Sequence, residues 1–592
     1  MTTFALLLFA AFASAAEHWR IEYIDNVVRG SVARRAIGVN GVWPPPTVHM
    51  DEGQVLVIHV HNSLDVPTTL HSHGLFQNGT QYQDGASGVT QCPIPPGENF
   101  TYTIPISTEA SGFMRTMQAR FSVPYLISCI PQYVDGLRSP LILHAAREAH
   151  IYDEEYIVTL SDWYYKEHPL LMEFFSSVYN PNGLEPVPDV ALVNEMVADQ
   201  VSFRFEPGKV YRLRFINMAA FAMFRIHLPE HMFNVIEVDG IDVQAHQVPA
   251  FSIAAAQRYS VLVEAKNTAD FNYKLKIDVD ISMFGIPSDI KTDLECSIVY
   301  NPDRPFFPDP PKTDSTEEVD MSKDLDDMDL VPLEVVPPFG PVTQHIPLDV
   351  DFAVYADGQN RGAFNETAFA VPQSTPTLLS AMSLPNALAV DPIQYGNARA
   401  IILDYAAVVE LVIKNFDTGS HPFHLHGHVF QIISRGPLSA GTDLSIAPIS
   451  SNPVRRDTVQ VQNEEYVVIR FVADNPGTWL MHCHIEWHLE AGLALTFIEA
   501  PERIAKPSSN VSAVIERHCA ALGRGFEGNA MGNMDGDMTG YIFEPAILWM
   551  GVPVRGWIGL LACAFSALVG SASVLWFASR EISAARNTEP TA

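Results

Sequence analysis

Residues 481–493 read MHCHIEWHLEAGL, and they place one of the chain's six cysteines between two histidines. Cysteine thiolate and histidine imidazole are the ligands that soft and borderline metal ions prefer. The stretch begins like a β-strand, on which successive side chains point to opposite faces of the sheet. We therefore expect Cys483 on one face, and His482 and His484 on the other. One short segment can in this way supply ligands to two metal sites that lie back to back.

A strand followed by a turn and closely spaced histidines occurs twice elsewhere in the chain. QVLVIHVHN leads into LHSHG in the first part, and VVELVIKN leads into HPFHLHGH in the last part. Aligning HSHG with HLHG pairs His71 with His424 and His73 with His426. A lone histidine is usually a surface or hydrogen-bonded core residue, but nine of the 21 histidines fall in these three clusters. The repeat indicates two related domains, and the clustering indicates metal ligands.

Strand-like segments dominate the rest of the sequence and predict an all-β protein. They are short, rich in β-branched and aromatic residues, and separated by glycine, proline and asparagine. Such segments favour β-sandwiches or barrels. The clearest of them are residues 53–64, 99–107, 209–218, 258–266, 407–415 and 466–474.

The charge of the chain argues against nucleic acid as a partner. The 592 residues hold 68 acidic side chains against 36 Lys and Arg, a formal net charge of −32. Such a chain repels phosphate backbones and attracts cations.

The two ends of the chain predict secretion and a membrane anchor. Residues 1–16, MTTFALLLFAAFASAA, form an apolar run that ends in small residues, as in a cleaved signal peptide. Residues 556–578 carry no charge and are long enough to cross a membrane as a helix. Arg580 and Arg586 follow and place the tail in the cytosol. A buried helix of a soluble domain is the alternative. Four N-glycosylation sequons support secretion, at Asn78, Asn99, Asn365 and Asn510.

Composition shifts along the chain suggest its domain boundaries. The predicted organisation is a signal peptide (1–16), a first domain (17–146), a second domain (147–300), an acidic proline-rich linker (301–339), a third domain (340–505), a stalk (506–555), a transmembrane helix (556–578) and a cytosolic tail (579–592).

The three histidine clusters resemble three of the four copper motifs of multicopper oxidases. The resemblance covers most of residues 20–500. GLFQNGTQYQDGASGVTQCPIPPG (74–97) and YNPNGLEP (179–186) are most similar to fungal iron-uptake ferroxidases, which carry one C-terminal membrane anchor. Laccase-like relatives come second. The resemblance implies three cupredoxin β-sandwich domains.

The resemblance also implies a set of copper ligands. The type 1 copper would take His421, Cys483 and His488, with the non-coordinating Leu493 at its axial position. A missing axial ligand is expected to raise the reduction potential. The implied ligands of the other ions are His71 and His424 for the type 2 copper, and His73, His426, His482 and His484 for the type 3 pair. Single electrons would pass from the type 1 site through Cys483 and its neighbours to this cluster, where O₂ becomes water.

Other residues take roles from the same resemblance. Asp84 and Glu486 match acids that lie near the trinuclear cluster and are implied to relay protons. Their alternatives are a turn-forming aspartate and a solvated glutamate. Cys92 is implied to pair with Cys519, whereas His428 matches no ligand. Cys296 and Cys563 are expected to be buried thiols.

The fourth motif of the family, G-x-x-x-x-H-x-H, is missing. Aligning Gly112 with Gly477 puts its two type 3 ligands at Met117 and Ala119, and there is no histidine between His73 and His144. Residues 113–131 are thus foreign to the family pattern. Either the chain has lost the site, or this stretch is an error in the gene model. As written, the chain could bind the type 1 copper and yet fail to reduce O₂.

Three functions follow from these observations. The first is a ferroxidase that uses O₂ and works beside an iron permease, and it depends on Glu185 in NPNGLEP, which matches an iron-binding carboxylate. Two further family aspartates fall at Phe284 and Ala406, so Asp280 and Asp404 are the candidates to replace them. Glu185 could equally be a loop acid. The second function is a laccase-like phenol oxidase, and the third is an inactive copper-binding homologue.

Overall fold

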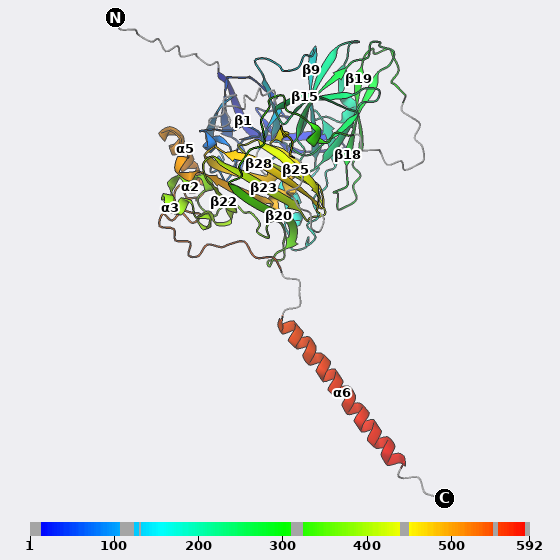
Figure 1. The fold of residues 1–592 in the computed structure, drawn as a ribbon, viewed down its shortest axis with the longest axis vertical. Helices are drawn as coiled ribbons and strands as arrows, with labels where there is room; N and C mark the ends of the chain where they lie inside the picture. The colour runs from blue at the N-terminus through cyan, green and yellow to red at the C-terminus, as the bar shows by residue number, and fades with distance from the viewer. Residues whose placement is uncertain are drawn as a thin grey trace. The chain divides into compact units, whose positions relative to one another are not determined.

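The computed structural model describes residues 14–106, 124–128, 132–308, 324–438, 449–548 and 554–586. The chain divides into two compact units, a body of residues 1–546 and a second unit of residues 547–592. Strands dominate the body, and the all-β prediction is confirmed (Figure 1). Each of the six expected strands is present: β4 (Val55–Asn62), β6 (Asn99–Pro105), β12 (Val210–Asn217), β17 (Arg258–Glu264), β23 (Ala407–Asn415) and β28 (Glu465–Ala473).

The first β-sandwich pairs a sheet of order β2-β1-β4-β6 with a sheet of order β3-β8-β7-β5. Its core follows from period-2 patterning, because Phe100, Tyr102 and Ile104 on β6 are buried and their neighbours are exposed. The other strands are β1 (Ser14–Arg29), β2 (Val32–Val39), β3 (Val48–Asp51), β5 (His71–Ser72), β7 (Pro124–Ser128) and β8 (Arg138–His144).

The second sandwich pairs a sheet of order β10-β9-β12-β17-β14-β15 with a sheet of order β11-β19-β18-β13-β16. Helix α1 (His168–Phe175) follows strand β9. The strands not yet given are β9 (Glu154–Trp163), β10 (Val190–Val193), β11 (Ser202–Arg204), β13 (Met223–His227), β14 (Phe233–Val238), β15 (Ile241–Val248), β16 (Ala250–Ile253), β18 (Tyr273–Asp280) and β19 (Asp293–Val299).

The third sandwich pairs a sheet of order β21-β20-β23-β28-β25-β26 with a sheet of order β22-β30-β29-β24-β27. Its remaining strands are β20 (Gln344–Val354), β21 (Asn360–Phe364), β22 (Ala400–Leu403), β24 (His421–Leu425), β25 (Phe430–Pro437), β26 (Arg455–Arg456), β27 (Thr458–Val461), β29 (Gly477–Cys483) and β30 (Ala494–Glu499). Its helices are α2 (Thr377–Ser383), α3 (Asn386–Ala389) and α4 (Glu486–Glu490).

The expected linker, residues 301–339, packs against the body where the structure describes it. Asp327 is buried and forms ion pairs with Arg456 and Arg435. Leu330 is only 1% exposed. At least one of the acidic residues that suggested a solvated linker is therefore buried, in ion pairs with arginine side chains of the third sandwich.

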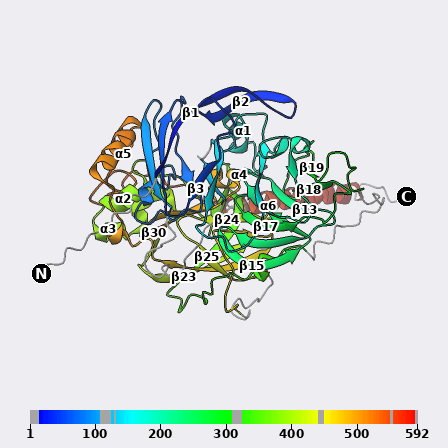
Figure 2. The ribbon, with the colours of Figure 1, turned by 90° about the horizontal axis from the view of Figure 1, so that it is seen from above.

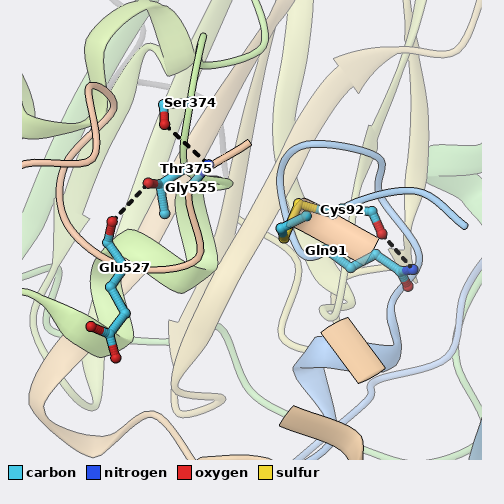
Figure 3. Close-up of a disulfide and its surroundings, with 7 residues drawn as sticks. Gln91, Cys92, Ser374, Thr375, Gly525 and Glu527 are labelled. Carbon is cyan, nitrogen blue, oxygen red and sulfur yellow. Dashed lines mark hydrogen bonds between the residues drawn. A yellow bond between two sulfur atoms is a disulfide. The ribbon is translucent and has the colours of Figure 1, made fainter. Parts of the chain in front are cut away.

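The expected stalk, residues 506–555, is a wrong prediction as far as Ala546. Helix α5 (Ser509–Ala521) contributes buried Ile515 and Cys519 to the core of the first sandwich, and it lies beside the strands of that sandwich in Figure 2. A disulfide joins Cys519 to Cys92. The segment beyond α5 hydrogen-bonds to the third sandwich, where Gly525 N donates to Ser374 Oγ at 3.1 Å (Figure 3). Polar backbone contacts of this kind leave no hydrophobic period in a sequence.

The second unit contains helix α6 (Val554–Arg586). Arg555–Arg580 within it has a mean hydropathy of 2.1 and is long and apolar enough to cross a membrane. Cys563 is exposed on this helix, so the expectation of a buried thiol is wrong there, whereas Cys296 is buried.

Candidate metal centres

The pairing of β24 with β29 brings the histidine clusters of the third sandwich together. His424 lies opposite His482, and Phe423 lies opposite Cys483. Since side chains alternate along each strand, His482 and Cys483 point to opposite faces of the sheet. The sequence thus builds two sites back to back on one short strand.

The first site contains His421, Cys483 and His488, each at most 1% exposed. The two Nδ1 atoms lie 3.0 Å apart, and Cys483 Sγ lies 3.7 Å from His421 Nδ1 and 3.3 Å from His488 Nδ1. Bonds of roughly 2.0–2.3 Å from one ion to imidazole nitrogen and thiolate sulfur give separations of this size. The three atoms therefore fit a single metal ion.

Carboxylates fix the outer nitrogens of both histidines. His421 Nε2 donates to Asp417 Oδ2 at 3.1 Å, and His488 Nε2 donates to Glu185 Oε1 at 3.1 Å. Each imidazole therefore keeps its Nδ1 lone pair for a metal. Burial raises the pKa of Cys483, but the neighbouring imidazoles of His488 and His421 outweigh it and lower this pKa to about 7. The thiolate, which is the form that binds metals, is thereby favoured.

Leu493, the residue expected at the axial position, has no donor atom in its side chain. It is fully buried, its N donates to His488 O at 2.9 Å, and its O accepts from Cys483 N at 3.1 Å. These backbone bonds tie the leucine to two of the ligand residues. Phe352 closes another side, with its ring stacked on that of His421 at 5.8 Å.

The second site lies between the first and third sandwiches. Its ligand candidates are His71, His73, His424, His426, His482 and His484. His426 Nε2 and His482 Nε2 lie 3.3 Å apart, which suits two nitrogens on one ion with bonds of roughly 2.0–2.1 Å.

Three buried nitrogens of this site have no hydrogen-bond partner: His71 Nε2, His73 Nδ1 and His424 Nε2. The opposite nitrogens are held, because His71 Nδ1 donates to Asp84 O at 2.6 Å and His424 Nδ1 donates to Asp457 O at 2.9 Å. Unpaired buried nitrogens are costly in a protein without a metal. Their convergence fits metal ions.

Arg258 and Asp457 also belong to this site and were not found from the sequence. They form a doubly hydrogen-bonded ion pair, 2.6 Å at each contact, and Arg258 Nη1 donates to His73 Nε2 at 3.1 Å. Arg258 belongs to the second sandwich and Asp457 to the third, so the pair links these two domains. It contacts His73 of the first sandwich and His424 of the third. No local motif marks them, because residues from three domains meet there.

Asp84 and Glu486 have opposite protonation behaviour. Asp84 Oδ2 accepts from His426 Nδ1 at 2.9 Å. Burial raises the pKa of Asp84, but His426 and His71 outweigh burial and hold it well below its usual range. Burial and the nearby Glu490 raise the pKa of Glu486 well above its usual range. Two carboxyl groups in one site whose pKa values are shifted in opposite directions suit different tasks.

Comparison with known proteins decides the family. Three family models described as multicopper oxidase match residues 20–146, 154–295 and 370–503. The chain belongs to the multicopper oxidase family. Copper is therefore the metal that this multicopper oxidase requires, and the donor atoms of the two clusters are of the kind and spacing that fit it. The resemblance seen in the sequence motifs is confirmed.

Similar proteins include several fungal iron oxidases. The chain is 39% identical to the iron multicopper oxidase fer1 of Mycosarcoma maydis, over 96% of this chain and 94% of that protein. It is 37% identical to the iron transport multicopper oxidase fio1 of Schizosaccharomyces pombe, over 92% of this chain and 85% of that protein. The crystal structure of Fet3p, described as a multicopper oxidase that functions in iron import, superposes with a TM-score of 0.82 at 32% identity and covers 91% of this chain and 100% of that one. The laccase from Botrytis aclada gives 0.74 at 27%, covering 86% and 92%.

The carboxylates beside the type 1 site of this multicopper oxidase differ from those expected. Glu185 is in contact with His488, as the resemblance implied. In the described part of the chain, no hydrogen bond or ion pair joins Asp280 or Asp404 to either type 1 histidine. The exposed Asp280 side chain instead accepts from Ser282 N. Asp417 is the carboxylate in contact with His421, and its spacing of four residues before this histidine was the available signal.

Several predicted residues stand apart from both sites or outside the described chain. His428 Nε2 lies 3.0 Å from Glu499 Oε2, which agrees with a structural role. Met117 and Ala119, the positions of the missing type 3 ligands, lie outside the described residues, as do Cys129 and residues 1–13 of the expected signal peptide.

Proposed function

We propose that this multicopper oxidase is a ferroxidase, which oxidises Fe²⁺ one electron at a time and passes four electrons to O₂ to form water, in support of iron uptake. One observation carries the proposal. Glu185 and Asp417 place a carboxylate on the outer nitrogen of each type 1 histidine, at 3.1 Å in both cases. The iron-related names of the similar fungal proteins support the same activity.

The two carboxylates provide a place for iron. Glu185 and Asp417 side chains are 18% and 20% exposed, so their free oxygens face solvent while the histidines are enclosed. Hard oxygen ligands favour Fe³⁺ over Fe²⁺ and so lower the potential of the iron couple. Because both carboxylates are hydrogen-bonded to the imidazoles, iron bound to them would lie next to the proposed type 1 ligands.

The remaining residues serve oxygen reduction. Bound copper supplies one-electron chemistry and the affinity for O₂. Cys483 is joined through one peptide bond on each side to His482 and His484, so the two sites are linked covalently. Asp84 orients His426 as an anion, and Glu486 holds a proton beside the cavity that His482 and His484 line. Glu486 is thus the proton donor of the proposal and Asp84 the positioning residue.

The proposed location is the plasma membrane, with the body outside the cell. The signal-like residues 1–16, the apolar stretch of α6 and four exposed sequon asparagines support it. A membrane-tethered ferroxidase can pass Fe³⁺ to a neighbouring iron permease, which is the proposed partner.

Paired substitutions test the iron site. Glu185→Ala and Asp417→Ala should each lower kcat/KM for Fe²⁺ by about tenfold or more, because each removes an oxygen ligand of the iron. Oxidation of a simple phenol should change less than about twofold. Asp280→Ala is the matched control, since this aspartate contacts neither histidine. Loss of phenol and iron turnover in equal measure, or unchanged iron turnover, would contradict the iron site and favour the laccase-like alternative.

A second candidate rests on the fourth motif. Because Met117 and Ala119 stand where two imidazoles are expected, the chain as written could be a copper-binding homologue without O₂ reduction. Absence of O₂ uptake with both Fe²⁺ and phenol would favour it.

A further inference from the structure

A third group of ligand-type side chains lies outside both copper sites. His168 is the first residue of α1, and Glu486 and Glu490 lie four residues apart on one side of α4. One donor atom from each of the three falls within 4.8 Å of the others. His168 Nε2 and Glu490 Oε1 are 3.8 Å apart.

Two of these side chains each contain a buried polar atom without a hydrogen-bond partner. His168 is 5% exposed and Glu486 is 6% exposed, and neither His168 Nε2 nor Glu486 Oε1 has a hydrogen-bond partner. Within the described ranges, no Lys or Arg forms an ion pair with Glu486 or Glu490. Buried carboxylates are costly unless a proton or a cation neutralises them.

The histidine of the group is held in place. Its ring is stacked on that of Trp487, 5.7 Å away at an angle of 6°, and its backbone N donates to Asp135 Oδ1 at 3.0 Å. A rigid imidazole whose free nitrogen faces two carboxylates is a preorganised metal ligand.

We propose that His168, Glu486 and Glu490 bind a divalent first-row transition cation of the Zn²⁺ type. An imidazole nitrogen with two carboxylate oxygens suits such ions, whereas Mg²⁺ and Ca²⁺ prefer oxygen alone. Bonds of roughly 2.0–2.2 Å require the donor atoms to draw together by about 1 Å. Glu490 can supply this movement, because its side chain is 24% exposed and lines an outer pocket with Ser87 and Val371.

The position of the site gives it a consequence for catalysis. Glu486 also lines the cavity that contains His71, His426, His482 and His484, and this cavity shares Ala86, Ser87 and Leu489 with the outer pocket. A cation on Glu486 would displace the proton from the carboxyl group that the proposed function uses as proton donor. Zn²⁺ should therefore slow O₂ reduction, and this part of the inference rests on the proposed function, whereas binding itself does not.

Zinc binding to the copper-loaded full chain in detergent tests the site. Equilibrium dialysis against Zn²⁺ followed by metal analysis should find one more zinc per chain in the wild type than in a His168→Phe, Glu490→Gln double variant. Each single substitution should weaken that binding by about tenfold or more. Copper content and blue absorbance should stay unchanged, since neither residue is a copper ligand. Zinc can also bind to the carboxylate oxygens of Glu185 and Asp417. The difference in zinc content between the wild type and the variants, not the total zinc content, therefore measures the proposed site.

The controls keep the result decisive. Glu490→Gln preserves shape at a partly exposed position and serves alone if His168→Phe does not fold. Glu502→Gln, an exposed acid elsewhere, should bind zinc as the wild type does. Equal zinc in wild type and Glu490→Gln would overturn the site. Zinc that binds only to the wild type but leaves O₂ uptake unchanged would support the site and count against Glu486 as proton donor.

Discussion

At the residue scale, Leu493 is the residue expected at the axial position of the type 1 site, where it cannot bind the metal. Its side chain is buried, and its backbone is hydrogen-bonded to both His488 and Cys483. Because the Leu493 side chain is fully buried, we expect this position to accept only a side chain of similar volume and to leave no room for water. The absence of a fourth donor is therefore a feature of packing that a single substitution can change.

Leu493→Met should lower the reduction potential of the type 1 copper, because a thioether in the axial position stabilises the oxidised ion. Similar volume should limit the loss of stability to about 1.5 kcal/mol or less. A redox titration followed by the blue absorbance measures the potential. An unchanged potential would mean that the methionine sulfur does not reach the copper.

The sequence could predict copper ligands better than the residues around them. His482 and Cys483 are the last two residues of β29 and His484 follows directly, so their spacing alone predicts two faces. Asp417, Arg258 and Asp457 were missed, because their roles arise only when separate loops and domains meet. Asp404 was favoured because it lies two residues before Ala406 in the sequence. It follows β22, whose last residue, Leu403, pairs with Glu499 at one end of β30. His482 pairs with Ala494 at the other end of β30, so Asp404 lies at the opposite end of the sheet from the ligands. Nearness along a sequence is therefore a poor guide to which end of a sheet a residue occupies, even within the sheet that holds the ligands.

At the scale of elements, the turn between β13 and β14 contains a histidine that must stay neutral. His231 is buried, its Nδ1 donates to Pro229 O at 2.8 Å, and Tyr300 Oη donates to its Nε2 at 3.0 Å. Burial lowers the pKa of His231 to about 4. The unfolded chain takes up the proton near pH 6.5, so the second sandwich should lose stability as pH falls from about 6.5 towards 4.

His231→Gln should reduce this acid sensitivity, because glutamine does not titrate. The linkage contributes on the order of 2 kcal/mol at pH 5. Calorimetric scans at pH 7 and pH 5 should show a smaller fall in Tm for the variant than for the wild type. Other buried histidines contribute equally to both proteins and cancel in the comparison. An identical fall would show that His231 is protonated in the folded protein or is not buried.

The disulfide fastens helix α5 to the first sandwich, between segments 427 residues apart in sequence. Replacing both Cys92 and Cys519 by Ser should destabilise this attachment by about 2–4 kcal/mol. Limited proteolysis should then cut residues 506–546 faster, while copper content stays the same because the cysteines lie outside the copper sites. Cys563→Ser, at an exposed position on α6, is the control. Unchanged proteolysis would mean that the core contacts of Ile515 hold α5 without the bond.

At the scale of the whole molecule, strand periodicity predicted an all-β protein and the family resemblance implied three sandwiches, but neither predicted how chain ends and linkers complete them. Residues 324–339 and 506–546 show no strand period, yet both pack on the rest of the body through ion pairs, backbone hydrogen bonds and a few apolar side chains such as Leu330 and Ile515. Hydrophobic period is a signal of core-facing elements only. Segments fixed by polar contacts therefore look like linkers or stalks in a sequence.

The copper content of the whole molecule tests the missing motif. Trinuclear chemistry needs ligands from both the first and the third sandwich, and within the described ranges the first contributes only His71 and His73. With Met117 and Ala119 in place of histidines, each type 3 ion lacks one imidazole, so we expect fewer than four coppers per chain. The Cys483 site should still give blue absorbance, because all of its ligands lie in the third sandwich.

The body of residues 17–546, purified with this sequence, is suited to metal analysis and to O₂ uptake with Fe²⁺, since it forms one compact unit. One or two coppers, blue absorbance and no O₂ uptake would place the defect at the type 3 pair. Sequencing the transcript across residues 113–131 then distinguishes a lost site from an error in the gene model, because only the second predicts an intact H-x-H in the natural chain. Four coppers with O₂ uptake would contradict the expectation and show that other residues replace the two histidines.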